Sequence, residues 1–161
     1  MAKALYLNKK WLVIIVVHMD AKTALKIIII LSLAGMAVDS LLTYNKIYSE
    51  KIGCPIGGGC DIVASSPYSV FLGIPVSVLG LGAYLFLFAV AILGLNGKIS
   101  EKNCLQLIIA FSAAGMIIAL WFIYLMEFVI QAICPWCLLS HAILFGILTI
   151  ALYAFLKLLK K

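Results

Sequence analysis

Four stretches of this sequence are long and apolar enough to cross a lipid bilayer as helices. A crossing takes roughly 20 apolar residues, because an α-helix rises about 1.5 Å per residue and the hydrocarbon core is about 30 Å thick. The stretches are residues 27–44, 74–95, 105–126 and 134–156. Hydrophobic residues make up 66% of the 161-residue chain and charged residues 11%, so the bilayer must be the solvent for most of it.

These stretches are expected to be helices rather than strands. In lipid the backbone must satisfy its own hydrogen bonds, so only helices and closed β-barrels span a membrane. Barrel strands alternate in polarity over about 10 residues, whereas residues 27–31 read Ile-Ile-Ile-Ile-Leu. We therefore predict an all-α, polytopic membrane protein, with a four-transmembrane-helix bundle in residues 24–161 and an N-terminal segment in residues 1–23.

The lysines are distributed unevenly between the two ends of the predicted bundle. The end that carries both termini has ten of the 12 lysines: Lys3, Lys9, Lys10, Lys22, Lys26, Lys98, Lys102, Lys157, Lys160 and Lys161. The other end has Lys46 and Lys51, offset by acidic residues. Lysines concentrate on the cytoplasmic side of membrane proteins. We therefore expect a multi-pass protein of the cell membrane with cytoplasmic termini. The lysines form no basic stripe of the kind that binds nucleic acid, and we expect none to be bound.

A short apolar run, residues 11–19, precedes the first span. Its nine residues would reach only about 14 Å as a helix, which is too short to cross the membrane. Asp20 and Lys22 follow at once, and no small-residue cleavage site stands where a signal peptide would need one. An interfacial helix is the preferred interpretation.

The longest connection, residues 45–73, lies on the predicted outer side and carries Cys54 and Cys60. The glycine triplet at 57–59 gives this loop a backbone that bends and rearranges easily. Two serines precede Pro67, a pattern typical of a helix start with serine as N-cap. We predict a short interfacial helix that begins there and runs into the second span.

The motif Cys134-Pro135-Trp136-Cys137 opens the fourth span on the same side. Proline favours the first helical position, which makes Cys134 the N-cap and Cys137 the third residue of the helix. Unpaired N–H groups and the dipole at a helix N-terminus stabilise a thiolate, and only the thiolate attacks a disulfide. Cys134 at the rim is thus placed to exchange with other cysteines, and Cys137 to meet something in the membrane.

Three interpretations of these four cysteines remain open. A redox relay is favoured, because the outer side is where disulfides persist and Cys-x-x-Cys is a redox spacing. Two purely structural disulfides are the second interpretation. A zinc site is the third, although Cys54 and Cys60 have five residues between them where zinc pairs usually have about two to four. The fifth cysteine, Cys104, is expected to be a small buried hydrophobe.

In these residues the chain resembles the vitamin K epoxide reductase family, especially its bacterial and archaeal members. The resemblance runs from about the first span onward and depends on the order of several motifs. They are Asp39-Ser40-Leu41, the Cys54/Cys60 pair, Ser65-Ser66, Gly73-Ile74-Pro75-Val76-Ser77 and Cys134-Pro135-Trp136-Cys137.

The resemblance implies a four-helix bundle with a quinone pocket near its outer end. By analogy, Cys54 exchanges with a thioredoxin-like protein, Cys60 forms a transient disulfide with Cys134, and Cys137 reduces a quinone of the ubiquinone or menaquinone type, without a metal. Many bacterial relatives carry a fused thioredoxin-like domain. Since this sequence stops at Lys161, we expect the partner to be a separate protein outside the membrane.

The expected activity is that of a disulfide-generating thiol:quinone oxidoreductase, because membrane quinones lie at more positive potential than most protein dithiols. A quinone-epoxide reductase on the same scaffold is one alternative. A non-enzymatic membrane protein with structural disulfides is another.

Four further residues are candidates for the site. The resemblance makes Ser66 a serine near the active site and gives His141 the position of a tyrosine in animal members. One turn from Cys137, His141 would donate a hydrogen bond to a quinone or move protons, or else be a polar residue satisfied inside the bundle. Trp136 is expected to be an interfacial anchor that walls the pocket. Asp39 is a proton acceptor or an orienter of the loop, or, as we favour, a hydrogen-bonding partner of the loop backbone.

Overall fold

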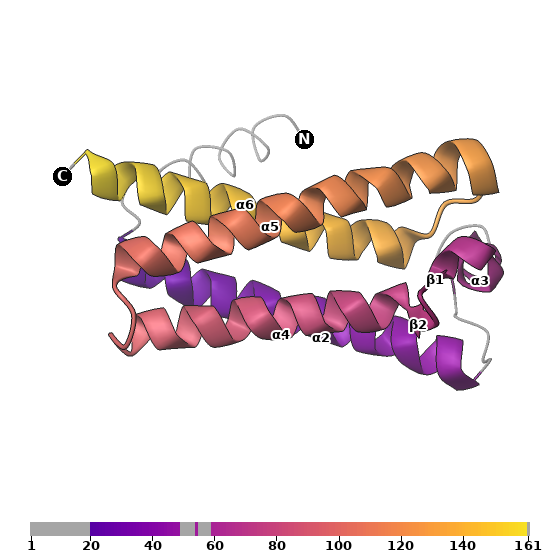
Figure 1. The fold of residues 1–161 in the computed structure, drawn as a ribbon, viewed down its shortest axis with the longest axis horizontal. Helices are drawn as coiled ribbons and strands as arrows, with labels where there is room; N and C mark the ends of the chain where they lie inside the picture. Colours follow the sequence, from indigo (N-terminus) through magenta and orange to yellow (C-terminus); the bar gives the residue numbers. More distant parts are fainter. Residues whose placement is uncertain (1–19, 49–53, 55–58, 161) are drawn as a thin grey trace, which may run out of the picture.

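The computed structural model describes residues 20–48, 54 and 59–160, and within them four long helices form an antiparallel bundle (Figure 1). The predicted interfacial helix at 11–19 lies outside the described residues, as do Gly57 and Gly58. The bundle helices are α2 (Ala21–Tyr48), α4 (Val76–Leu95), α5 (Glu101–Tyr124) and α6 (Pro135–Leu159). Each covers one of the apolar stretches, so the predicted membrane-spanning four-helix bundle is confirmed.

The helices pack around a small apolar core. Helix α2 packs against α4 and α6, and α5 packs against the same two helices. The fully buried side chains include Leu25, Ile28, Leu87, Ile108 and Ile147. Large hydrophobic side chains such as Ile30 and Ile117 instead point outward, with 65% and 71% of their surface exposed. A bundle that exposes so much apolar surface is suited to lipid, where close van der Waals packing holds helices together.

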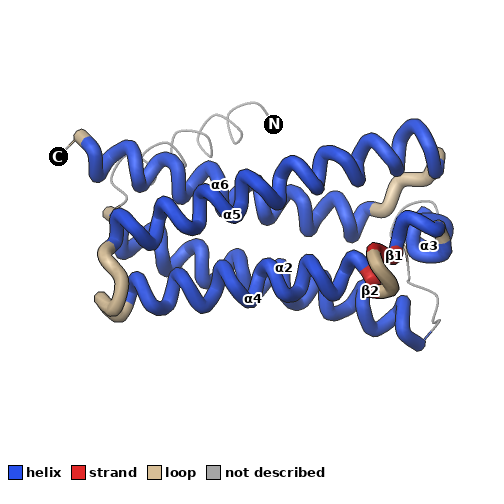
Figure 2. The backbone as a smooth tube through the Cα atoms, viewed as in Figure 1, coloured by secondary structure: helices blue, strands red, loops and turns tan. Residues whose placement is uncertain are grey.

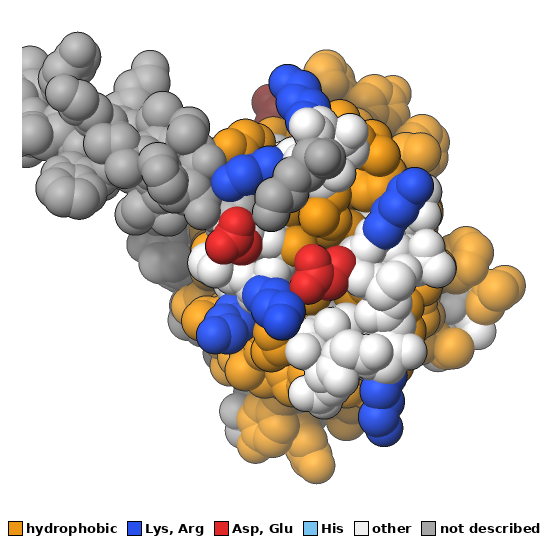
Figure 3. All heavy atoms as spheres, turned by 90° about the vertical axis from the view of Figure 1, so that its left-hand side faces the viewer, with side chains coloured by type: hydrophobic (Ala, Val, Ile, Leu, Met, Phe, Trp, Pro, Cys, Tyr) orange, Lys and Arg blue, Asp and Glu red, His pale blue; other side chains and the backbone are white. Residues whose placement is uncertain are grey.

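The two ends of the bundle differ in charge. Figure 3 looks onto the end where α2 begins and α6 ends, and shows basic side chains around its rim. The described lysines of this end are Lys22, Lys26, Lys98, Lys102, Lys157 and Lys160. At the opposite end, the described residues include one lysine, Lys46, together with Asp61 and Glu127. The structure therefore places most of the described lysines at one end of the bundle, as the sequence predicts.

The connection from α2 to α4 is a compact cap over this opposite end (Figure 2). It contains α3 (Gly59–Ser65), a single 3-10 turn η1 (Pro67–Ser69) and a two-stranded antiparallel hairpin. The hairpin strands are β1 (Val70–Phe71) and β2 (Ile74–Pro75).

The predicted helix start at Pro67 is present as the 3-10 turn η1, with Ser66 at its N-cap position, but this helix does not run into the second span because the β1–β2 hairpin intervenes. The Ser66 hydroxyl donates to the Val63 carbonyl at 2.8 Å, so its side chain closes the end of α3 and makes no capping hydrogen bond to η1. Leu72 and Gly73 then adopt left-handed φ angles of 51° and 82°, which turn the chain into the hairpin. Helix α4 begins after Pro75.

Helix α5 does not stop at Tyr124 but continues as a π-helical segment, η2 (Leu125–Ile130). Gln131 has a left-handed φ of 54°, and from it the chain returns to the start of α6. The exposed rings of Trp121, Tyr124 and Phe128 stack along this end of the helix, with centroid separations of 5.7 and 5.1 Å.

We expect Ile28→Ala to destabilise the bundle by on the order of 2 kcal/mol, because it leaves a cavity among fully packed side chains. The measurement is the unfolding free energy in mixed micelles. Ile30→Ala on the same helix is the matched control and should cost much less, since Ile30 faces outward. Equal losses for the two variants would contradict the described core.

Candidate functional site

The four cysteines that the sequence places on one side come together beneath the cap. Cys54 and Cys60 form one disulfide, with a Cα separation of 5.9 Å, and Cys134 and Cys137 form another, with a separation of 5.3 Å. Cys60 and Cys134 are each 1% exposed and share a buried cluster with Met126. Cys54, Cys137 and Trp136 pack against this cluster. One end of the bundle therefore holds two disulfides against each other.

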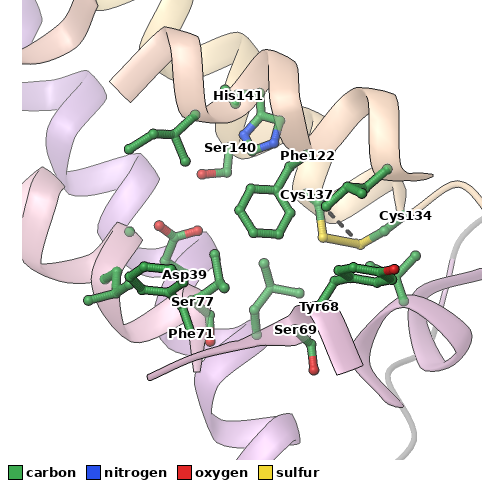
Figure 4. Close-up of a pocket in the computed structure, with 18 of the residues that line it drawn as sticks. Asp39, Tyr68, Ser69, Phe71, Ser77, Phe122, Cys134, Cys137, Ser140 and His141 are labelled. Carbon is green, nitrogen blue, oxygen red and sulfur yellow. Dashed lines mark hydrogen bonds between the residues drawn. A yellow bond between two sulfur atoms is a disulfide. The ribbon is translucent and has the colours of Figure 1, made fainter. Parts of the chain in front are cut away.

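The Cys-Pro-Trp-Cys motif has the predicted helix geometry. Cys134 is the N-cap of α6 and Pro135 follows at the first turn. The Cys134 sulfur accepts a hydrogen bond from the Cys137 backbone N–H at 3.2 Å, drawn as the dashed line in Figure 4. This donor and the helix dipole would stabilise negative charge on Cys134 when the disulfide opens.

Gly59 allows α3 to lie close to the irregular segment that precedes Cys134. A Cβ atom built on Gly59 would fall on the Ile133 carbonyl oxygen, so a side chain here would push α3 away. The sequence suggested only flexibility for the glycine triplet. In the structure, its last member is helical and buried, and its lack of a side chain brings Cys60 to the N-terminus of α6.

Lys46 fastens the cap to the bundle. From the last turn of α2, its ammonium donates to the Ala64 carbonyl near the end of α3 at 2.5 Å and to the Ser69 hydroxyl at 2.9 Å. A cation at a helix C-terminus is also favoured by the dipole. Sequence reasoning used Lys46 only in the charge count, because nothing local in the sequence links it to a segment 18 residues away.

A cavity of about 790 Å³ lies beside the cysteines, between the helices and the cap (Figure 4). Its volume is in the usual range for small-molecule sites, and such sites combine apolar walls with a few polar groups. Cys60, Cys134 and Cys137 line it, together with aromatic side chains that include Trp121 and Phe122.

The polar part of the cavity wall is built around Ser140. Tyr84 donates from its hydroxyl to the Ser140 carbonyl at 2.5 Å, and the two hydroxyl groups lie 3.3 Å apart. The Ser140 side chain also interacts with the carboxyl group of Asp39, which is 4% exposed. Nε2 of His141 is buried and has no hydrogen-bond partner among the described residues. This atom is therefore available to a molecule in the cavity.

The predicted site residues divide into two groups. Asp39 and His141 line the cavity with Cys60, Cys134 and Cys137. Asp39 interacts with the side chain of Ser140 on α6, and its hydrogen bond to the loop backbone, which we favoured, stays a prediction. Ser66 closes α3 and is not among the lining residues, and Trp136 packs on the cysteine cluster.

Sequence reasoning missed Ser69, Ser77, Tyr84 and Ser140, all of which line the cavity. A signal existed for Ser140, which stands three residues after Cys137 and therefore on the same helix face. Tyr84 looked like one more aromatic residue in an apolar span. The described residues contain no cluster of three or more side chains suited to a metal ion.

Comparison with known proteins finds a matching family and a plant relative. The sequence model described as "Vitamin K epoxide reductase family" matches residues 26–152, which include all five cysteines. The protein named "Thiol-disulfide oxidoreductase LTO1" from Arabidopsis thaliana is 32% identical over 112 residues, which are 66% of this chain. The aligned region spans only 30% of that relative's length.

We expect Gly59→Ala to slow the formation of a Cys60–Cys134 disulfide by about tenfold or more, because the new methyl group meets the Ile133 carbonyl. The rate is measured by gel mobility after mild oxidation of a Cys54→Ser, Cys137→Ser protein. Gly82→Ala is the control, since a Cβ there meets nothing within 4 Å. A rate unchanged by Gly59→Ala would show that the close approach does not govern exchange.

Proposed function

The chain belongs to the vitamin K epoxide reductase family, and from this premise we propose that it is a membrane thiol oxidase. In this proposal it passes electrons from an extracytoplasmic thioredoxin-like protein to a membrane quinone and so supports disulfide formation. The observation that carries the proposal is the pair of disulfides in one cluster, one of which borders a large apolar cavity. The printed name of the plant relative supports thiol–disulfide chemistry.

The first half of the relay is exchange at the outer pair. Cys54 is half-buried whereas Cys60 is buried, so a partner thiolate attacks the Cys54 sulfur. The Cys54–Cys60 bond breaks and Cys60 leaves as a thiolate. A second thiol of the partner then breaks the mixed disulfide, which leaves the partner oxidised and both loop cysteines reduced.

The second half transfers the electron pair to the inner pair. The Cys60 thiolate attacks Cys134, and the Cys134–Cys137 bond breaks. Cys54 then attacks Cys60, which restores the Cys54–Cys60 disulfide and leaves Cys134 and Cys137 reduced. Cys134 is the target because it shares the buried cluster with Cys60 and its sulfur already accepts an N–H hydrogen bond.

The cavity fits a quinone headgroup by its chemistry. A quinone has a flat apolar ring with two acceptor oxygens. The cavity offers aromatic walls and Nε2 of His141, which has no hydrogen-bond partner in the described part of the chain. In the tautomer protonated at Nε2, His141 would donate a hydrogen bond to one oxygen. When bound, a ubiquinone- or menaquinone-type molecule supplies an acceptor for two electrons and two protons. Cys137 lines the cavity and is the cysteine assigned to deliver the electrons.

The proposed orientation places the cysteines outside the cell membrane and the lysine-rich end of Figure 3 in the cytoplasm. The charge bias between the two ends supports it.

We expect a membrane-impermeant maleimide to label reduced Cys54 in intact cells. A cysteine introduced by Gly97→Cys, in the turn between α4 and α5, should react only after the membrane is opened. These two sites lie at opposite ends of the bundle, so labelling of both from outside would contradict the assigned orientation.

We expect Cys137→Ser to abolish quinone reduction by a reduced thioredoxin-like protein in membranes, because the electron pair then has no exit at the cavity. Quinol formation is followed by absorbance. Cys104→Ser is the control and should retain activity, since the buried Cys104 thiol donates to the Val90 carbonyl inside the core and does not line the cavity. Full activity of Cys137→Ser would reject the relay.

A second candidate reaction follows from the description of the matching family. Reduction of a quinone epoxide would use the same cysteines and cavity with the electrons flowing in the same direction. Assays of a quinone and its epoxide side by side with one reductant distinguish the two substrates.

A further inference from the structure

We propose that Asp39 is the residue that hands a proton to the occupant of the cavity, and that Ser140 and Tyr84 hold its carboxyl group in place. The proposal rests on the proposed function, because it assigns one of the protons that quinone reduction requires. It is carried by the position of a carboxyl group inside a membrane-spanning helix, in the same cavity wall as Cys137.

The carboxyl group is enclosed by the protein rather than by water. Asp39 is 4% exposed, and one of its carboxyl oxygens rests against Gly80 so closely that a Cβ there would collide with it. Among the described residues no salt bridge reaches Asp39: Lys46, on the same helix, directs its ammonium to Ala64 and Ser69. An ionisable group in a span is costly unless it is paired or functional.

Ser140 and Tyr84 are suited to a positioning role. The single hydroxyl proton of Tyr84 goes to the Ser140 carbonyl, which leaves the Ser140 hydroxyl able to donate to Asp39. The arrangement joins α2, α4 and α6 through one residue, since the Ser140 carbonyl accepts from Tyr84 and the Ser140 side chain interacts with Asp39. It fixes the carboxyl group while leaving it in the cavity wall.

The reaction requires proton transfer because of its overall balance. Oxidation of the Cys134 and Cys137 thiols to a disulfide releases two electrons and two protons, and a quinone takes up two of each to become a quinol. In the proposal, Asp39 donates one proton to a quinone oxygen and regains one released by the thiols. The second is carried by His141, which lines the same cavity.

Other titratable side chains face the cavity and will shape its pH dependence. They are Cys137 and His141 from α6, Tyr84 from α4, Tyr68 from η1, Cys60 from α3, Cys134 at the start of α6, and Lys46 further along α2. The test therefore compares variants under one pH series rather than interpreting a single curve.

The experiment uses the full chain in lipid nanodiscs, reduced chemically and mixed rapidly with a short-chain ubiquinone or menaquinone. With Asp39→Asn, quinol formation in a single turnover should slow by about 100-fold or more, the usual loss for a missing general acid. Exchange between the two cysteine pairs, measured by thiol trapping, should stay within about twofold. Glu127→Gln is the matched control, because this exposed carboxylate lies outside the cavity wall.

Two readouts separate proton transfer from a structural role. Infrared spectra of the quinone-free protein should show a protonated-carboxyl band that Asp39→Asn removes and Glu127→Gln retains. Ser140→Ala should move the fall in the rate of quinol formation to higher pH, because it removes a donor to the carboxylate form. A purely structural role would lower unfolding stability without moving this pH profile.

The possible outcomes are distinct. If the wild type reduces no quinone while its cysteine pairs still exchange, the proposed function fails and this inference fails with it. If the wild type reduces quinone and Asp39→Asn matches it in rate and pH profile, only this inference is overturned. Should Asp39→Asn fail to fold, Ser140→Ala decides, and an unchanged pH profile there overturns the proposal.

Discussion

In a bundle surrounded by lipid, each polar group must find its partner inside the protein, and this constraint organises the whole molecule. It forces the spans to be helices and leaves little room for polar side chains away from the ends. Three polar side chains of the spans gather at one place, where Tyr84 and Ser140 are joined by hydrogen bonds and Asp39 interacts with Ser140. The cavity that they border is also lined by cysteines, so these polar groups and the thiols share one end of the bundle.

The geometry gives each part of the cysteine site a separate physical cause. The N-cap position of Cys134 comes from the proline that follows it, and the approach of Cys60 comes from the missing side chain of Gly59. Lys46 adds hydrogen bonds that hold the cap down on the bundle. These three causes lie in different parts of the sequence, so each can be altered by a single substitution.

Much of this arrangement could be predicted from the sequence, and the failures have physical reasons. Long apolar runs predict spans, and a Cys-Pro-x-Cys motif predicts its own helix start, because both signals are local. The helix predicted after Ser66 begins where expected but is only one 3-10 turn long, because Leu72 and Gly73 adopt left-handed φ angles and turn the chain into a hairpin before α4. The cavity was out of reach, since Tyr84 and Ser140 are 56 residues apart and meet only when α4 packs beside α6. For the same reason, the sequence could not show that the carboxyl group of Asp39 interacts with Ser140 of the bundle.

The length of the third span has a consequence for where the chemistry takes place. From Glu101 to Ile130 the helix has 30 residues, or roughly 45 Å, which exceeds a hydrocarbon core of about 30 Å. The stacked rings of Trp121, Tyr124 and Phe128 sit along the excess, and aromatic side chains settle at the boundary between lipid and water. These rings would fix the depth of the site in the membrane, because the short segment that turns at Gln131 connects this end of α5 to the start of α6. These three aromatic rings would therefore set the depth in the membrane at which the cysteines take electrons from the aqueous side and pass them to an acceptor in the lipid.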